Sequence, residues 1–225
     1  MSALRARDLY RFYRVGDDET LALRGVSLEV PAGRLVAVAG PSGSGKSTLL
    51  ACLAGLDEPD GGSVYVHDAR VSHRPEQERA ALRARHIGTL FQSANLLEHL
   101  TVQRNIELAQ RIAGRRDRGR TEGLLDAVRL TGRSGARPSE LSGGEAVRAG
   151  LAVALANSPD VLIADEPTGE LDGITEVAVL QLIRDEADRG TAVIIASHSA
   201  AVTGMADQVV RLKDGHVQED GQVQS

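Results

Sequence analysis

Gly40-Pro41-Ser42-Gly43-Ser44-Gly45-Lys46-Ser47-Thr48 is the stretch that decides the fold of this chain. It fits the pattern G-x-x-x-x-G-K-[ST], in which glycines let successive backbone N–H groups point at one anion. The loop follows the apolar run Leu35–Ala39 and precedes the helix-like stretch Thr48–Leu56, whose positive end would face the same anion. We therefore expect residues 40–48 to bind phosphate, with Lys46 on the outer phosphates and Ser47 offering a hydroxyl to Mg²⁺.

The alternative is a glycine-rich turn that matches this pattern by chance, and lysine usage argues against it. The chain holds 24 arginines but only two lysines, Lys46 and Lys213. A compact ammonium and a planar guanidinium are not equivalent at a crowded phosphate. The sequence therefore predicts a nucleotide site at this loop.

The pattern around the loop predicts an α/β fold with a mainly parallel sheet. Four short apolar runs lack polar alternation, as strands buried on both faces do: Leu35–Ala39, Val161–Ala164, Ala192–Ala196 and Val209–Leu212. Helix-like stretches alternate with them: Thr48–Leu56, Thr121–Leu130, Glu145–Asn157 and Ile174–Arg189. The segment up to Val30, with its turn signal Gly16-Asp17-Asp18, predicts antiparallel strands. Residues 93–159 show no strand pattern, so we expect a single domain of residues 1–225 in which a helical subdomain at 93–159 interrupts a core at 1–92 and 160–225.

Composition excludes several classes of protein. The 225 residues carry a formal net charge of −5 and only 2% aromatics, which disfavours nucleic-acid binding. The arginines at 115–120 are interpreted as a solvated loop rather than a nucleic-acid contact. Cys52, the single cysteine, excludes an internal disulfide and is expected to be a buried apolar side chain rather than a redox group. No apolar run has signal-peptide or membrane-spanning length, so a cytosolic location is expected.

Two further strand ends carry polar pairs. Asp165 and Glu166 follow Val161–Ala164, and the alternative is a pair of surface acids. Because consecutive strand residues point to opposite faces, we expect different tasks: Asp165 holds Mg²⁺ through its water shell and Glu166 polarises the attacking water. His198 leaves the strand Ala192–Ala196, where it could reach the γ-phosphate, although a lone histidine is more often structural. Gln92 places an amide after the apolar-leaning stretch Ile87–Leu90.

A second anion-binding geometry is expected at Leu141-Ser142-Gly143-Gly144-Glu145, which precedes a helix. It has no lysine, so it suits phosphates already held elsewhere. The Ser142-x-x-Glu145 spacing is also a capping box, which would fold the carboxylate back onto the Ser142 N–H. Together with the elements above, the chain resembles the ATP-binding subunits of ABC transporters. The ordered set that carries the resemblance is Tyr13, GPSGSGKST, Gln92, LSGGE, VLIADEP, GELD and His198.

This resemblance implies a P-loop NTPase with a RecA-like core that binds ATP and Mg²⁺ and hydrolyses ATP. Two such subunits, identical or different, would pair so that the phosphate loop of one faces the LSGG segment of the other. The roles it implies are Tyr13 stacking on adenine, Gln92 contacting Mg²⁺ and water, Ser142, Gly143 and Gly144 contacting ATP across the dimer, and Asp172 linking the two sites. The residues that it implies for catalysis are Lys46, Gln92, Glu166 and His198. The segment from residue 93 onward would dock on a separately encoded membrane permease, placing the protein at the inner face of the membrane.

Finer features resemble the lipoprotein-release and macrolide-export group: GLDEPDGG at 55–62, LLEHLTVQRNI at 96–106 and ADEPTGELD at 164–172. A mechanical or signalling ATPase of the cell-division type stays open as an alternative, because it would use the same motor. A DNA-repair or chromosome-organising ATPase is disfavoured, because it would need heptad arms or a basic groove and the sequence shows neither pattern. The chain departs from the family pattern at a few positions, which are Glu145, Gly150, Val153, Glu170 and Ser199, and none of these removes a phosphate, metal or water-activating group.

Overall fold

A computed structural model of the chain describes residues 2–15, 18–91 and 95–218. Its centre is a six-stranded sheet whose strands in spatial order are β10 (His216–Gln218), β9 (Gln208–Lys213), β3 (Leu35–Ala39), β8 (Ala192–Ala196), β7 (Val161–Asp165) and β6 (Ile87–Leu90). All neighbouring pairs are parallel except β10 with β9. The predicted α/β fold with a mainly parallel sheet is confirmed.

A second, antiparallel sheet is built largely from the N-terminal segment. Its order is β2 (Asp18–Pro31), β1 (Ser2–Val15), β4 (Gly61–Val66) and β5 (Ala69–Arg70). The predicted antiparallel strands are confirmed, while β4 and β5 join a sheet that the sequence pattern assigned only to residues up to 30. Gly16 and Asp17 of the predicted turn lie outside the described residues.

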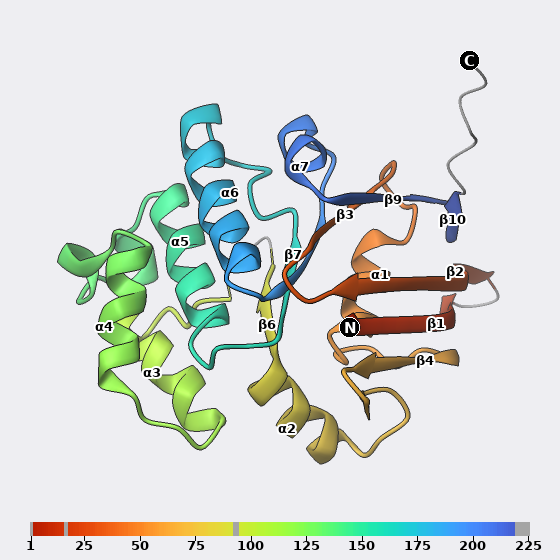
Figure 1. Cartoon of the computed structure of the whole chain (residues 1–225), viewed down its shortest axis with the longest axis horizontal. Coiled ribbons are helices and arrows are strands. Elements are labelled where there is room, and N and C mark those ends of the chain that lie inside the picture. Colours follow the sequence, from red (N-terminus) through yellow and green to blue (C-terminus); the bar gives the residue numbers. More distant parts are fainter. Residues whose placement is uncertain (1, 16–17, 92–94, 219–225) are drawn as a thin grey trace.

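The two faces of the central sheet are buried in different cores, which explains the absence of polar alternation. On β3, Val36 and Val38 pack with helix α1 (Lys46–Leu53) and the antiparallel sheet, whereas Leu35 and Ala37 pack with helices on the other face. β7 and β8 alternate in the same way. Figure 1 shows α1 between the central strands and the β1–β2–β4 layer. Cys52 of α1 is buried in this core, as expected.

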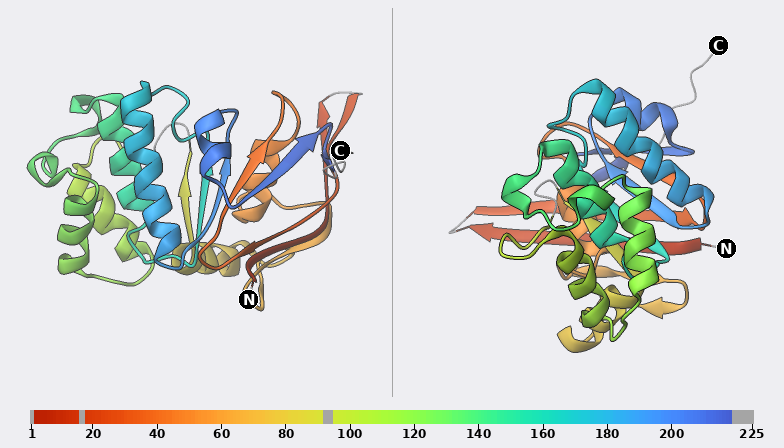
Figure 2. Two further views of the ribbon diagram at one scale, coloured as in Figure 1. Left: turned by 45° about the horizontal axis from the view of Figure 1, so that its top comes forward. Right: turned by 90° about the vertical axis from the view of Figure 1, so that its left-hand side faces the viewer.

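Helices cover the other face and extend away from it on the side opposite the antiparallel sheet, as Figures 1 and 2 show. The described helices beyond α1 are α2 (Glu76–His86), α3 (Val102–Ile112), α4 (Arg118–Ala127), α5 (Gly143–Ala154), α6 (Gly173–Asp188), α7 (Ala200–Met205) and the 3₁₀ turns η1 (Thr131–Arg133) and η2 (Pro138–Glu140). Residues 95–159 carry helices and no strand. Within the described ranges, no helix combines the length and apolarity needed to cross a bilayer.

Some helices begin or end at other residues than the periodic pattern predicted, because a capping residue or a residue with left-handed backbone lies there. α4 begins three residues before the predicted Thr121 because the Asp117 carboxylate accepts the Arg120 N–H at 2.8 Å. It ends before Arg129, whose φ of +58° is incompatible with a right-handed helix. Similarly, α1 already begins at Lys46, with Gly45 as its N-cap residue.

Asp207 fastens the start of β3 to neighbouring elements. Its carboxylate accepts the Leu35 N–H at 2.7 Å, and Nη1 of Arg184 and of Arg34 donate to it at 2.8 and 3.0 Å. The hydrogen bonds from Arg184 and from the Leu35 N–H lower the pKa of Asp207 from 3.8 to about 2. The hydrogen bonds of this one carboxylate therefore connect β3, α6 and the segment before β9.

We predict that Asp207→Asn lowers the free energy of unfolding by about 1–2 kcal/mol at neutral pH, because charge-assisted hydrogen bonds are lost. The folded-state pKa lies below 3.8, so this contribution is present above about pH 4 and lost as the pH falls toward about 2. Urea unfolding of the wild type and the Asp207→Asn variant between pH 7 and pH 3 measures the difference between their free energies of unfolding, which should narrow as the pH falls. Asp188→Asn is the control, since it removes an exposed carboxylate from the same Arg184 and should cost under about 0.5 kcal/mol. Equal losses from the two substitutions would contradict the prediction.

Candidate functional site

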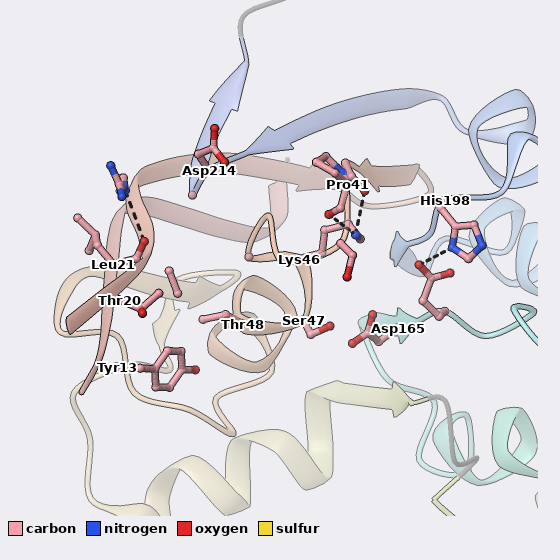
Figure 3. Close-up of a pocket in the computed structure, with 18 residues that line it drawn as sticks. Tyr13, Thr20, Leu21, Pro41, Lys46, Ser47, Thr48, Asp165, His198 and Asp214 are labelled. Atoms are coloured by element: carbon pink, nitrogen blue, oxygen red, sulfur yellow. Dashed lines mark hydrogen bonds and ion pairs between the residues drawn. The ribbon is translucent and has the colours of Figure 1, made fainter. Parts of the chain in front are cut away.

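A hollow of about 730 Å³ opens where the phosphate loop meets the carboxyl ends of β7 and β8 (Figure 3). It is lined by Tyr13, Thr20, Leu21, Ala22, Arg24, Gly40, Pro41, Ser42, Gly43, Gly45, Lys46, Ser47, Thr48, Asp165, Glu166, His198, Asp214 and Gly215. Ligands of open α/β sheets bind at such strand ends. The fold thus brings together predicted residues that lie up to 185 positions apart in the sequence.

The phosphate loop is held by close backbone approaches that only glycine permits. A Cβ on Gly40 would collide with the carbonyl oxygen of Leu212 on β9, and a Cβ on Gly45 would lie 2.5 Å from that of Ala22 on β2. Gly45 has a φ of +100°, which also disfavours a side chain. Ser44 does not line the hollow but is buried, and its carbonyl accepts the Gly215 N–H at 3.1 Å.

The ammonium of Lys46 bends back over the loop. Nζ donates to the carbonyl oxygens of Gly40 at 2.9 Å and Pro41 at 3.1 Å. In Figure 3 these bonds hold Lys46 above Ser47, with Asp165 across the hollow. A phosphate entering the loop would meet a cation, the N-terminus of α1 and a hydroxyl in one place.

Asp165 and Glu166 both line the hollow, where their expected tasks would place them, but Glu166 lies beyond the last strand residue, so strand alternation does not apply to it. The strand ends at Asp165, and Glu166 has a φ of +46°, which turns its side chain back toward the site. Their surroundings still differ. Oδ1 of Asp165 is buried and receives no hydrogen bond from any residue in the described ranges, whereas both oxygens of Glu166 are occupied.

The carboxylate of Glu166 is fixed by the two residues that follow β8. The hydroxyl of Ser197 donates to Oε2 at 3.0 Å, and Nδ1 of His198 lies 2.9 Å from Oε1. Ser197 is buried and in turn accepts the Ser199 N–H at 3.1 Å. The sequence predicted a task for His198 but none for Ser197, because nothing local reveals that Ser197 meets a side chain at the end of the neighbouring strand.

Ser199, one of the departures from the family pattern, caps α7 and joins a small polar network. Its hydroxyl donates to Oε1 of Glu176 at 2.7 Å, and the Thr168 hydroxyl donates to the same oxygen at 3.2 Å. This network connects α6 to the segment just after Glu166. A serine here therefore supports the site without entering the hollow.

Residues that could hold a divalent cation meet near Ser47. The Ser47 side chain and the unbonded Oδ1 of Asp165 line the same hollow, and a hydroxyl with a carboxylate oxygen suits Mg²⁺. The donor set therefore fits the expected ion. Gln92, the third expected ligand and a predicted catalytic residue, lies outside the described residues.

The LSGGE segment lies away from this hollow, at the start of α5. The Ser142 side chain accepts the Glu145 N–H at 3.3 Å, and Oε2 of Glu145 accepts the Ser142 N–H at 2.9 Å, so the predicted capping box is confirmed. The Ser142 N–H and the charge of Arg133 hold the pKa of Glu145 below its ordinary value. Ser142 and Gly143 are exposed, whereas Gly144 is buried. Gly144 lies so close to Thr175 of α6 that a Cβ at this position would collide with it.

Asp172 is exposed at the start of α6 and does not line the hollow. Its carboxylate caps the helix by accepting the N–H groups of Ile174 and Thr175 at 3.1 and 3.0 Å. The phosphate-contacting residues predicted for one nucleotide are thus divided between the hollow and a separate surface.

Several lining residues were not identified from the sequence. Thr20, Leu21, Ala22 and Arg24 belong to β2, and the Asp214-Gly215 turn joins β9 to β10. The Arg24 N–H donates to the Gly215 carbonyl at 2.9 Å, which draws both segments to the loop. Such contacts depend on tertiary packing. The Asp-Gly pair at 214–215 is a turn signal, but it indicates a turn and not a contact with the nucleotide site.

Comparison with known proteins identifies the family. The model of the family described as ABC transporter matches residues 23–169. The chain is 44% identical over 218 residues to the macrolide export ATP-binding/permease protein MacB of Rhodopirellula baltica, covering 94% of this chain and 32% of that protein. It is 40% identical over 216 residues to the lipoprotein-releasing system ATP-binding protein LolD of Paramagnetospirillum magneticum, covering 94% and 96%. It therefore spans about a third of the first relative and nearly all of the second.

Solved structures of ATP-binding cassettes have the same fold as this chain. The fold matches an ATP-binding cassette, MJ0796, in a dimeric post-hydrolysis state bound to ADP and Pi, with a TM-score of 0.90, 31% identity and 99% of each chain covered. A second dimeric structure of MJ0796 gives a TM-score of 0.89 at 32% identity, covering 96% of this chain and 97% of that one.

We predict that Gly45→Ala destabilises the fold by about 2–3 kcal/mol and abolishes triphosphate binding, because left-handed strain adds to a collision with Ala22. Gly43→Ala is the matched control: Gly43 has a φ of +77° but no neighbour within 4 Å, so only strain of about 1–2 kcal/mol is expected. Urea unfolding and calorimetric titration with ATP measure both effects. Equal destabilisation by the two substitutions would show that the close approach to β2 is unimportant.

Proposed function

The chain belongs to the ABC transporter family as an ATP-binding cassette that hydrolyses ATP, and from this premise we propose that two such cassettes clamp two ATP molecules and drive the membrane permease of an export system. The division of the phosphate-contacting motifs carries the proposal. The hollow contains the loop at 40–48, Asp165, Glu166 and His198, whereas Ser142 and Gly143 are exposed outside it. A second cassette would supply the missing half of the site.

Nucleotide binding begins with the phosphate loop. The backbone N–H groups of residues 40–48 and the positive end of α1 would surround the phosphates. Nζ of Lys46 would exchange the carbonyl oxygens of Gly40 and Pro41 for phosphate oxygens. Tyr13, at the far end of the hollow in Figure 3, would stack on the adenine ring.

Asp165 and Ser47 would hold Mg²⁺, Asp165 through the water shell and Ser47 directly, with Gln92 as a further ligand. The unbonded Oδ1 of Asp165 supports this assignment. When bound, the ion would neutralise charge that develops on the outer phosphates.

Glu166 is the residue we assign to water activation. Ser197 and His198 hold both of its oxygens, so the carboxylate faces the hollow in one orientation. Glu166 would orient the attacking water and accept its proton, while the exposed ring of His198 would contact the γ-phosphate. Most of the lowering of the barrier would come from positioning and charge stabilisation around that phosphate.

The cassettes would pair with Ser142, Gly143 and Gly144 of one copy facing the phosphates held by the other. A carboxylate at position 145 would repel those phosphates, but in this chain it is tied to the Ser142 N–H and lies 3.3 Å from Nε of Arg133. Asp172, capping α6 on the exposed surface, would contribute to the contact between the two sites. The dimeric state of the MJ0796 cassette supports this arrangement.

A second hollow, of about 300 Å³, is the surface we assign to the permease. It lies among α2, β6, α3 and α5 and includes Ile112 and Leu56, which are 69% and 50% exposed. Apolar side chains left this exposed favour burial against a partner. Val153, one of the departures from the family pattern, also lines it, so that difference falls on the proposed partner surface.

The names of two relatives support a proposal about export and location. MacB is named for macrolide export and carries a permease in the same protein, and LolD is named for lipoprotein release. We therefore propose an exporter or a lipid, lipoprotein or peptide system, with this cassette at the inner, cytoplasmic face of the membrane.

We predict that Glu166→Gln binds ATP but hydrolyses it at least 100-fold more slowly, because the acceptor for the water proton is lost. The trapped nucleotide should hold the cassettes together, so light scattering during gel filtration with Mg·ATP should show a dimer. Adding Ser142→Arg as a control should block the opposing contact and leave an ATP-bound monomer. Turnover near the wild-type rate would remove Glu166 from its assigned role, and a monomer at saturating ATP would overturn the clamp.

We also predict that Ile112→Glu abolishes co-purification of the tagged chain with an integral membrane permease from its native membranes, because a charge would enter the apolar docking hollow. Basal ATP hydrolysis should stay within about twofold, since Ile112 lies outside the nucleotide site. Ile112→Val is the matched control and should retain the permease. Recovery of no integral membrane protein by the wild type would contradict the membrane partner, and retention by the glutamate variant would contradict the assigned surface.

A further inference from the structure

The segment GLDEPDGG, which joins α1 to β4, has no task in the proposed mechanism, yet two of its carboxylates reach β1 beside Tyr13. The Tyr13 hydroxyl donates to Oδ2 of Asp57 at 2.7 Å. Arg11 donates to both oxygens of Asp57, from Nε at 2.9 Å and from Nη2 at 2.8 Å. A two-point contact of this kind fixes the plane of the guanidinium as well as its position.

Asp60 completes the attachment. Its Oδ2 accepts the Phe12 N–H at 2.7 Å and Nη1 of Arg11 at 3.1 Å. Its own N–H donates to the Tyr10 carbonyl at 2.9 Å. The end of β1 that carries Tyr13 is therefore bound to the α1–β4 connection through backbone and side chain together.

The guanidinium also lies against the aromatic ring. Cζ of Arg11 is 4.7 Å from the centroid of the Tyr13 ring, within cation–π range. Tyr13 lines the nucleotide hollow, whereas Arg11 and Asp57 do not. The ring is thus supported from outside the hollow, although it is 37% exposed and would otherwise rotate freely.

The ionisation states suit this arrangement. Burial and the hydrogen bond to Asp57 raise the pKa of Tyr13, so its hydroxyl keeps the proton that it donates. Burial acts to raise the pKa of Asp57, but hydrogen bonds from Tyr13 and Arg11 outweigh it and hold that pKa below the ordinary value. Asp57 is therefore a carboxylate at neutral pH.

We propose that Asp57 and Arg11 are positioning residues that hold the Tyr13 ring in place as a preset platform for the nucleobase. This inference rests on the stacking role of Tyr13 in the proposed function. Immobilising a free side chain on binding weakens affinity, and a ring that is already fixed avoids that cost. In the proposed function the polyphosphate binds at residues 40–48 rather than at the ring, so the effect is expected for the base alone.

The test compares ADP with inorganic pyrophosphate, each titrated with Mg²⁺ by calorimetry into the full chain. Tyr13→Ala should weaken ADP binding at least 10-fold, as expected for lost stacking, and leave pyrophosphate binding unchanged. Asp57→Ala should weaken ADP binding about 3- to 10-fold and again spare pyrophosphate. In the Tyr13→Ala background, Asp57→Ala should have no further effect on ADP, because there is no ring left to position.

Two further variants keep the test decisive. Tyr13→Phe removes only the hydroxyl and should reproduce the ADP-specific loss even if Asp57→Ala fails to fold. Glu58→Gln is the matched control: Glu58 lies in the same connection, but its carboxylate faces Arg79 and His73 rather than β1, so both affinities should be retained.

The outcomes separate the inference from the function on which it rests. If Tyr13→Ala leaves ADP binding unchanged relative to pyrophosphate, the proposed adenine contact is wrong. If Tyr13→Ala weakens ADP while Asp57→Ala and Tyr13→Phe do not, the positioning role is overturned and the adenine contact stands. Equal loss of both ligands, or an undiminished effect of Asp57→Ala without the ring, would also overturn it.

Discussion

The structure depends on the close fit of one glycine loop between two strands. Gly40 meets the backbone of Leu212 on β9, Gly45 meets that of Ala22 on β2, and the Ser44 carbonyl accepts the Gly215 N–H. These approaches fix the backbone N–H groups and the first turn of α1 around one point, where a phosphate would meet them without rearrangement of the backbone. β2 and β9 belong to different sheets, so the shape of the loop depends on the packing of the two sheets against each other.

Around that loop, neighbouring side chains orient Glu166 and Tyr13. Ser197 and His198 hold Glu166, and the network of Ser199, Glu176 and Thr168 supports the segment beside it. On the opposite side, Asp57 and Arg11 hold Tyr13. Orienting a catalytic or binding group in advance lowers the entropy lost when the ligand binds.

Three further motif residues, Ser142, Gly143 and Asp172, are exposed outside the hollow. Ser142 and Asp172 cap α5 and α6, while Ile112 lies at a separate hollow. In the proposed function, such a cassette would bind the phosphates in its own hollow and present its exposed motif residues to a second cassette. Hydrolysis, dimer closure and work on a permease would then be linked through surfaces rather than through a single cavity.

The sequence by itself determined the phosphate loop, the doubly buried strands, the capping box at Ser142 and Glu145, and the family, because each of these is encoded in neighbouring residues or a fixed spacing. Tertiary structure decided which distant groups meet. Strand alternation predicted different tasks for Asp165 and Glu166, but only the tertiary structure shows that Ser197 and His198 bind Glu166 while Oδ1 of Asp165 receives no hydrogen bond from a described residue. The tasks of Ser197, Asp57 and the β9–β10 turn could likewise not be predicted from the sequence. Their partners lie dozens of residues away, and a local sequence pattern does not indicate such long-range contacts.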